Sequence, residues 1–143
     1  MIDHLLKRVM LDTNVLFSAM YKLESKSFDA FSIASKKPYR LVLCDQIIDE
    51  LRRIFYRKFP LKIPAIEQFL LNTHYELITL ASTDEADDDE ETICDADDRP
   101  ILRAARKAKV DIFITGDKDF LNSSVTNPKI FTTANFIELE LNV

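Results

Sequence analysis

Histidine and cysteine are scarce in this sequence, and their scarcity excludes one class of metal site. The 143-residue chain contains two cysteines and two histidines. Cys44 and Cys94 lie far apart without CxxC spacing, and with only His4 and His74 to join them a tetrahedral zinc site is a poor interpretation. We interpret the cysteines as reduced residues used as small hydrophobes. Any metal bound here should therefore be a hard cation with oxygen ligands.

Long apolar segments are also missing. No run reaches the roughly 18 apolar residues that a membrane-spanning helix needs, and residues 1–8 lack the apolar core and charge placement of a secretory signal. An apolar content of 47% is nevertheless typical of a chain with a buried core, and 143 residues suit one domain. We therefore expect a single domain over residues 1–143, in a cytoplasmic protein that does not enter a membrane.

The negative charge is concentrated in one segment. The formal net charge is −5, but residues 82–98 contain ten acids and no base. Without them the chain carries 14 acids against 19 bases, a balance compatible with binding phosphate groups. Because so many like charges repel one another in any compact arrangement, we expect a solvated acidic loop at about residues 82–92.

Apolar runs alternate with helical periodicity along the chain. The expected strands are at residues 8–12, 39–44, 75–80, 111–115 and 129–131. The expected helices are at residues 14–20, 27–36, 45–58, 65–73, 100–109 and 134–141, with a turn or short helix at 117–123. Strands that alternate with helices imply right-handed crossovers and a mostly parallel sheet. The pattern therefore predicts a three-layer α/β domain.

Acidic residues gather at one edge of this expected sheet. Asp12 ends the first strand, Glu50 lies in the first turns of the helix after the second, and Asp117 follows the fourth. A further group of acids, at 95, 97 and 98, precedes the helix at 100–109. Ligands of open α/β sheets bind beyond the carboxyl ends of the strands. Carboxylates gathered there would raise one another's pKa values unless a cation neutralised them, so we expect a Mg²⁺ or Mn²⁺ site.

Each of these residues also has a purely structural interpretation. Asp12 and Asp98 could be helix caps, and Asp117 a turn residue. Glu50, taken alone on its amphipathic helix, is better explained as a solvent-facing residue. Gly116, the only glycine, could mark a need for backbone freedom or close approach beside Asp117, or only an ordinary turn. The convergence of the acids on one edge favours a site.

Four motifs resemble those of the PIN-domain family, especially small bacterial and archaeal proteins of the VapC-like toxin type. In chain order they are LDTNVL at 11–16, IDEL at 48–51, DADDRPIL at 95–102 and TGDKDFL at 115–121. The first motif combined with the last is specific, and the four span most of the chain. The resemblance implies a PIN-like three-layer α/β/α sandwich with a mostly parallel central sheet. It also implies a Mg²⁺- or Mn²⁺-dependent ribonuclease.

The same resemblance assigns roles to individual residues. Four carboxylates would form the acidic site and hold one or two ions: Asp12, Glu50, Asp98 and Asp117. Asp119 would be an outer ligand. Asn14 would orient Asp12 or its water by hydrogen bonding, and Thr115 would contribute a hydroxyl.

The third acidic position is open between neighbouring residues. Asp95, Asp97 and Asp98 stand close together, and one sequence does not decide which of them points into the site. Asp98 is our choice because it lies immediately before the Arg-Pro-Ile-Leu start of the helix, and Asp95 is the second choice.

The resemblance also implies partners. RNA would be the substrate, its backbone held by basic residues near the acidic edge: Arg52, Arg53, Arg57, Lys58, Arg99, Arg103 and Lys118. A small antitoxin protein that covers the cleft and a homodimer are further expectations. For the acidic loop, keeping RNA from part of the surface and binding a basic partner are alternatives to a purely solvated role.

Two other functions compete with this interpretation. A non-catalytic PIN-like domain could bind RNA or protein, but a scaffold has no need to keep four mutually repelling acids. A phosphoryl-transfer domain also groups acids at strand ends. A dehalogenase-type phosphatase needs a second acid where this chain has Asn14, and a receiver needs a lysine where it has 115–117.

Overall fold

A parallel sheet forms the centre of the fold. The computed structural model describes residues 6–79, 88–92 and 98–141. Within them, five strands pair in the order β3-β2-β1-β4-β5, and every pair is parallel. The strands are β1 (Lys7–Leu11), β2 (Tyr39–Cys44), β3 (Glu76–Ile78), β4 (Ile112–Ile114) and β5 (Lys129–Phe131). The predicted α/β fold with a parallel sheet is confirmed.

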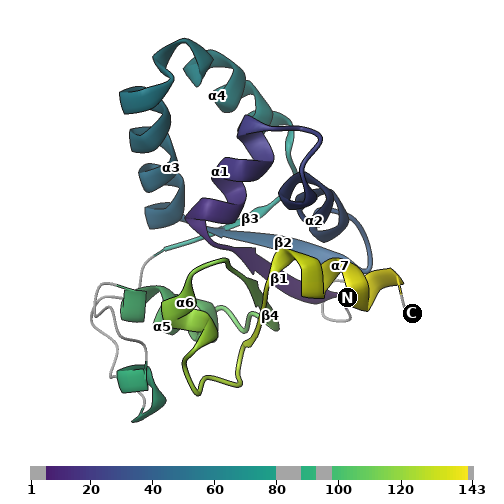
Figure 1. Cartoon of the computed structure of the whole chain (residues 1–143), viewed down its shortest axis with the longest axis vertical. Coiled ribbons are helices and arrows are strands. Elements are labelled where there is room, and N and C mark those ends of the chain that lie inside the picture. The colour runs from purple at the N-terminus through teal and green to yellow at the C-terminus, as the bar shows by residue number, and fades with distance from the viewer. Residues whose placement is uncertain (1–5, 80–87, 93–97, 142–143) are drawn as a thin grey trace.

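Helices flank this sheet. They are α1 (Thr13–Tyr21), α2 (Lys26–Ala34), α3 (Asp45–Lys58), α4 (Ile63–Asn72), α5 (Arg99–Lys107), α6 (Lys118–Leu121) and α7 (Thr133–Leu141), with 3₁₀ helices η2 (Pro60–Lys62) and η3 (Asp88–Thr92). In Figure 1 the α3–α4 pair lies at one end of the molecule and α5 with α6 at the other, with strands between them. None of the helices in the described residues is long and apolar enough to span a membrane.

Burial of apolar side chains explains why these segments form their elements. The last three residues of β1, Val9, Met10 and Leu11, are completely buried, as expected of a central parallel strand covered on both faces. On α3 the buried residues are Ile47, Ile48, Leu51 and Phe55, the single apolar stripe of an amphipathic helix. The polar residues of the same helix are left to face its other sides.

The order of the strands creates one crevice. The chain builds β1, β2 and β3 in one direction across the sheet and then adds β4 and β5 on the other side of β1. The strand order therefore reverses between β1 and β4, where ligands of open α/β sheets bind. At the carboxyl end of this pair Leu11 lies opposite Ile114, and the Asp12 amide donates to the Ile114 carbonyl at 3.0 Å. The residues that follow the two strands are thereby placed side by side.

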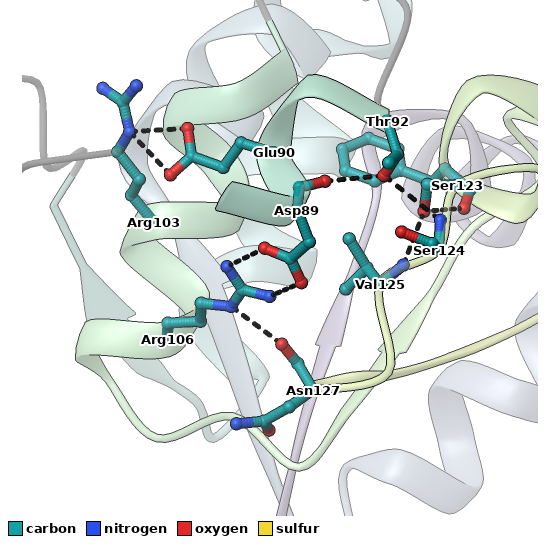
Figure 2. Close-up of polar contacts among 10 residues, drawn as sticks. Asp89, Glu90, Thr92, Arg103, Arg106, Ser123, Ser124, Val125 and Asn127 are labelled. Atoms are coloured by element: carbon teal, nitrogen blue, oxygen red, sulfur yellow. Dashed lines mark hydrogen bonds and ion pairs between the residues drawn. The ribbon is translucent and has the colours of Figure 1, made fainter. Parts of the chain in front are cut away.

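The prediction of a solvated acidic loop is wrong for residues 88–92. They form η3, in which the side chain of Glu90 is only 1% exposed. Figure 2 shows why like charges are tolerated there. Arg103 on α5 donates from Nε to both carboxylate oxygens of Glu90 at 2.9 and 3.1 Å. Arg106 on the same helix donates two hydrogen bonds to the Asp89 carboxylate, at 2.9 and 2.6 Å. Residues 82–87 of the expected loop lie outside the described residues.

The same segment joins α5 to the loop between α6 and β5. The Ser124 amide donates to the Thr92 hydroxyl at 3.1 Å, and Arg106 Nε donates to the Asn127 carbonyl at 2.8 Å. Figure 2 shows Thr92 bonded to Ser124, and Arg106 bonded to both Asp89 and Asn127. The chain segments around α5 and α6, which carry acids expected in the site, are therefore joined both through η3 and directly by Arg106.

Candidate metal centre

Three carboxylates meet at the start of α5 and α6. One oxygen each from Asp98, Asp117 and Asp119 lies within 4.8 Å of the other two, and all three residues are half-buried. Asp117 follows β4 and caps α6 by accepting the Asp119 amide at 2.9 Å. Asp98 stands before α5, but its side chain makes no capping hydrogen bond to that helix. Helix capping therefore does not explain the acid at this position. Asp119, expected as an outer ligand, is a full member of this group.

The competing candidates for the third position are not placed by the structure. Asp95 and Asp97 lie outside the described residues. The choice of Asp98 over these two therefore stays a prediction, supported by the proximity of Asp98 to the two acids after β4.

Asp12 is a buried carboxylate next to this group. It is 7% exposed at the carboxyl end of β1. Its Oδ1 accepts the Thr13 amide at 2.8 Å, and its Oδ2 accepts the Thr115 hydroxyl at 2.7 Å. Asp12 therefore caps α1, as the structural interpretation proposed, while its second oxygen is turned toward β4. The two interpretations of this residue are compatible.

The electrostatic environment of Asp12 disfavours its charge. Burial raises the pKa of Asp12, the hydrogen bonds from Thr115 and Thr13 lower it in part, and the nearby charges of Asp117 and Glu50 raise it again. Asp12 therefore lies close enough to Asp117 and to Glu50 to be affected by their charges. A cation at this edge would relieve the repulsion that all the carboxylates share.

Glu50 is not the solvent-facing residue that its helix position suggested. It is half-buried, and its Oε2 accepts the Thr13 hydroxyl at 2.9 Å while its Oε1 accepts the Gln46 amide group at 3.2 Å. The partner on α1 comes from a distant part of the chain, so the period of α3 alone did not reveal it. The hydrogen bond from Gln46 to Glu50 was predictable from the sequence, because Gln46 stands four residues before Glu50 on the same face of α3.

Two threonines connect the acids, and the sequence reasoning gave a role to only one of them. Thr13 donates its amide to Asp12 and its hydroxyl to Glu50. Thr115, which is fully buried, donates its hydroxyl to Asp12 and accepts the Asp117 amide at 3.0 Å. Threonine hydroxyl groups thus hold the carboxylates of Asp12 and Glu50 and the backbone of Asp117. The signal for Thr13 was its place directly after Asp12.

Asn14 and Gly116 differ from expectation. Asn14 is exposed, and within the described residues its side chain does not hydrogen bond to Asp12. Gly116 has no positive φ, and a Cβ added there would meet no atom within 4 Å. Neither backbone freedom nor a close approach of protein atoms therefore requires the glycine. Both residues border a pocket beside the acids.

The basic residues that we expected to hold RNA near the site lie in different environments. Arg52 donates to Glu67 on α4 at 2.7 Å, and Arg53 Nε donates to the Asp49 carbonyl at 3.4 Å. Arg103 is bonded to Glu90 as described above. Lys118 is exposed as the first residue of α6, and Arg99 is half-buried as the first of α5. These last two directly follow Asp117 and Asp98 in the chain.

The donor set fits a hard divalent cation. The three-acid group offers only carboxylate oxygens, which suit Mg²⁺ or Mn²⁺ rather than zinc or copper. Asp12 and Glu50 add two more carboxylates whose orientations are fixed by hydrogen bonds. Such an arrangement can hold a cation at the crevice between β1 and β4 and leave room for a substrate oxygen or water.

Comparisons with known proteins agree with this geometry. A PIN-domain family model matches residues 8–119. Among solved structures, a chain in the crystal structure of VapBC2 from Rickettsia felis, bound to a DNA fragment from their promoter, superposes with a TM-score of 0.62. The match covers 87% of this chain and 96% of that chain at 16% sequence identity. No curated protein has a significantly similar sequence.

Proposed function

Because the chain belongs to the PIN-domain family, we propose that it is a metal-dependent endoribonuclease that hydrolyses phosphodiester bonds in RNA. The observation that carries the proposal is the convergence of Asp98, Asp117 and Asp119 beside the buried Asp12, at the crevice where the strand order reverses. A chain that needed these positions only for folding would gain from removing such mutual repulsion.

One or two Mg²⁺ or Mn²⁺ ions would be held by five carboxylates: Asp12, Glu50, Asp98, Asp117 and Asp119. When bound, the cation supplies an activated water and stabilises negative charge on the phosphate and leaving oxygens. The protein supplies the positions of the carboxylates. Thr13 and Thr115 keep Asp12 and Glu50 from rotating away from the crevice.

Basic side chains would hold the RNA backbone. We assign this role first to Lys118 and Arg99, which adjoin the acids, and then to Arg53, which follows Glu50 by one helical turn. Arg52 would have to leave Glu67 before it could bind a phosphate. Exposed lysine and arginine contribute mostly sequence-independent affinity.

The likeness to a VapBC2 chain supports a finer proposal. We propose that this chain is the toxin of a toxin–antitoxin pair, a cytoplasmic single domain over residues 1–143, and that a small antitoxin protein covers its acidic crevice. Homodimerisation is part of the same proposal. Co-expression with the product of a short adjacent reading frame, followed by size-exclusion chromatography with light scattering, tests both associations.

The direct test is cleavage. Purified protein with Mn²⁺ should cleave single-stranded RNA, EDTA should stop the reaction, and Asp117→Asn should be inactive. Glu138→Gln is a matched control, because it makes the same chemical change at an exposed position on α7. Equal behaviour of the wild type and Asp117→Asn on a broad panel of RNAs would contradict the proposed function.

A non-catalytic PIN-like domain that binds RNA or protein is the alternative. Calorimetric titration with Mn²⁺ separates the two functions, since a scaffold has no use for the cation. Binding of Mn²⁺ that Asp117→Asn abolishes supports the nuclease. RNA binding without Mn²⁺ binding or cleavage supports the scaffold.

The Thr115 hydroxyl should matter through the carboxylates that it orients. We expect Thr115→Val to lower the cleavage rate or the affinity for Mn²⁺ about 10–100-fold, the usual cost of losing a group that positions metal ligands. Valine keeps the volume of threonine but leaves Asp12 Oδ2 without its hydrogen bond. Thr115→Ser retains the hydroxyl and should stay within a few-fold of wild type. Equal losses in the two variants would show that packing, and not the hydroxyl, is what the site needs.

A further inference from the structure

A small pocket lined by uncharged residues adjoins the acidic crevice. It has a volume of about 160 Å³ and lies between α1, α2, the segment after β4 and the start of α7. Its walls include Thr115, which also donates to Asp12, and Gly116, which directly precedes Asp117. The pocket is therefore joined to the candidate metal centre through a stretch of only three residues.

The residues that line the pocket are uncharged, and its wall combines hydroxyl and amide groups with a larger share of apolar atoms, including those of Val15. Its polar members are Asn14, Ser18, Ser27, Thr115, Thr132 and Thr133. The carboxylates of the neighbouring centre suit a cation, whereas hydroxyl and amide groups suit a neutral partner that both donates and accepts hydrogen bonds. The chemistry of the walls thus changes from charged to neutral within a few residues.

Several of these side chains are available to a ligand. Thr115 is engaged with Asp12, and Thr132 accepts the Asn135 amide at the start of α7. Within the described part of the chain, no hydrogen bond involves the side chains of the remaining four: Asn14, Ser18, Ser27 and Thr133. Polar groups that line a concave site and lack protein partners can fix the orientation of a small ligand.

Gly116, which lines the same pocket, leaves its backbone accessible there. Its backbone conformation does not need glycine, and the space where a Cβ would lie holds no protein atom within 4 Å. A glycine that the fold itself does not require is explained if a ligand approaches the backbone there. The pocket is also smaller than the roughly 300–1,000 Å³ of sites for drug-sized ligands, so a single ring-sized unit fits it better than a larger cofactor.

We propose that this pocket binds the ribose of the nucleoside next to the scissile phosphate of the RNA substrate. The hydroxyl and amide groups of its walls would contact the sugar hydroxyls, the base would lie outside the pocket, and the phosphate would lie past Gly116 toward the acids. The 2′-hydroxyl is the group by which proteins distinguish RNA from DNA, and a hydroxyl-lined wall suits it. This inference rests on the proposed nuclease function, and it assigns the selection of the substrate to Ser18 and Ser27.

Nucleoside binding tests the pocket without requiring cleavage. Isotope-labelled protein would be titrated with adenosine, cytidine, guanosine and uridine, with amide chemical shifts as the readout. We expect saturable shifts, in the millimolar range, at Ser18, Ser27, Gly116 and Thr133 for at least one nucleoside, and weaker binding of its 2′-deoxy form. Shifts confined to other surfaces would overturn the proposal, whether or not the protein cuts RNA.

Paired variants sharpen the same test. Ser18→Ala combined with Ser27→Ala should weaken binding of that nucleoside about 25-fold, since a typical hydrogen bond contributes a factor of about five and two are removed. Ser32→Ala is the matched control, because it removes a hydroxyl from the same helix as Ser27 outside the pocket. Gly116→Ala should also weaken binding while leaving the melting temperature unchanged, since the added Cβ has free space. Unchanged affinity in both pocket variants overturns the assignment.

Discussion

Asp12→Asn should abolish RNA cleavage and also stabilise the protein in the absence of metal. The first effect follows from the loss of a carboxylate that faces the crevice. We expect a fall of about a thousandfold, which corresponds to about 4 kcal/mol of transition-state stabilisation. The second effect follows from burial, because the wild-type chain holds a charge where folding disfavours it.

The pH dependence of the second effect has a definite sign. Folding raises the pKa of Asp12 above its ordinary value of 3.8, chiefly through burial, so the folded state binds the proton more tightly than the unfolded state. The resulting loss of stability is absent below the unfolded pKa, grows as the pH rises, and is complete above the folded pKa. Asparagine keeps the shape of the side chain and removes this loss.

Thermal unfolding in the presence of EDTA measures the difference in stability between Asp12→Asn and the wild type. The melting temperature of Asp12→Asn should exceed that of the wild type near neutral pH, by about 2–4 °C for each kcal/mol relieved. The difference should shrink toward the acidic end of the folded range. Mn²⁺ should raise the melting temperature of the wild type and have little effect on the variant. A variant less stable than the wild type at every pH would show that the charge of Asp12 is not a cost of folding.

Much of the fold was predictable because burial leaves a regular pattern. β2, α3 and β5 have the predicted bounds, since each is a mainly apolar run or a single amphipathic stripe. Asp12 and Asp117 were also accessible, because each directly follows a buried strand and parallel strands bring their carboxyl ends to one edge.

The remaining features depend on side chains that meet from distant parts of the chain. The bond from Thr13 to Glu50 crosses from α1 to α3, and no periodicity within either helix encodes it. The acids of η3 appeared as a repelling run because their partners, Arg103 and Arg106, stand on the next helix. A count of charges along the sequence places Glu50 and the acids of η3 in solvent. In the folded chain Glu50 is bonded to Thr13, and the η3 acids Asp89 and Glu90 are bonded to arginines of α5.

Glu90→Ala should therefore be strongly destabilising, although it removes one acid from a highly acidic segment. The variant removes the ion pair and both hydrogen bonds that Arg103, whose side chain is only 20% exposed, makes with Glu90. Breaking a buried ion pair from one side costs about 3–5 kcal/mol. Because Arg103 keeps some contact with water, we expect about 3 kcal/mol, or a fall of about 6–12 °C in melting temperature.

Two comparisons isolate the buried pair. Asp89→Ala should cost less, because the side chain of Asp89 is 33% exposed and its pair with Arg106 is better solvated. The double variant Glu90→Ala with Arg103→Met should recover part of the stability lost by Glu90→Ala, since neither charge is then left unpaired. The single variant Arg103→Met completes the comparison. If the double variant loses as much stability as Glu90→Ala and Arg103→Met together, the carboxylate and the guanidinium do not stabilise each other.

The same variant connects the acidic segment to the metal centre. η3 pairs with Arg103 and Arg106 of α5, which begins after Asp98, and accepts a hydrogen bond from the loop that follows α6, the helix that Asp117 caps and Asp119 belongs to. A direct bond from Arg106 to the Asn127 carbonyl joins the same two parts. Loosening η3 should let these elements move apart, so Glu90→Ala should also weaken Mn²⁺ binding at temperatures where the protein is still folded. Calorimetry at low temperature measures that affinity, with Glu138→Gln as the control for an acid lost elsewhere. Unchanged Mn²⁺ affinity would confine η3 to a role in stability.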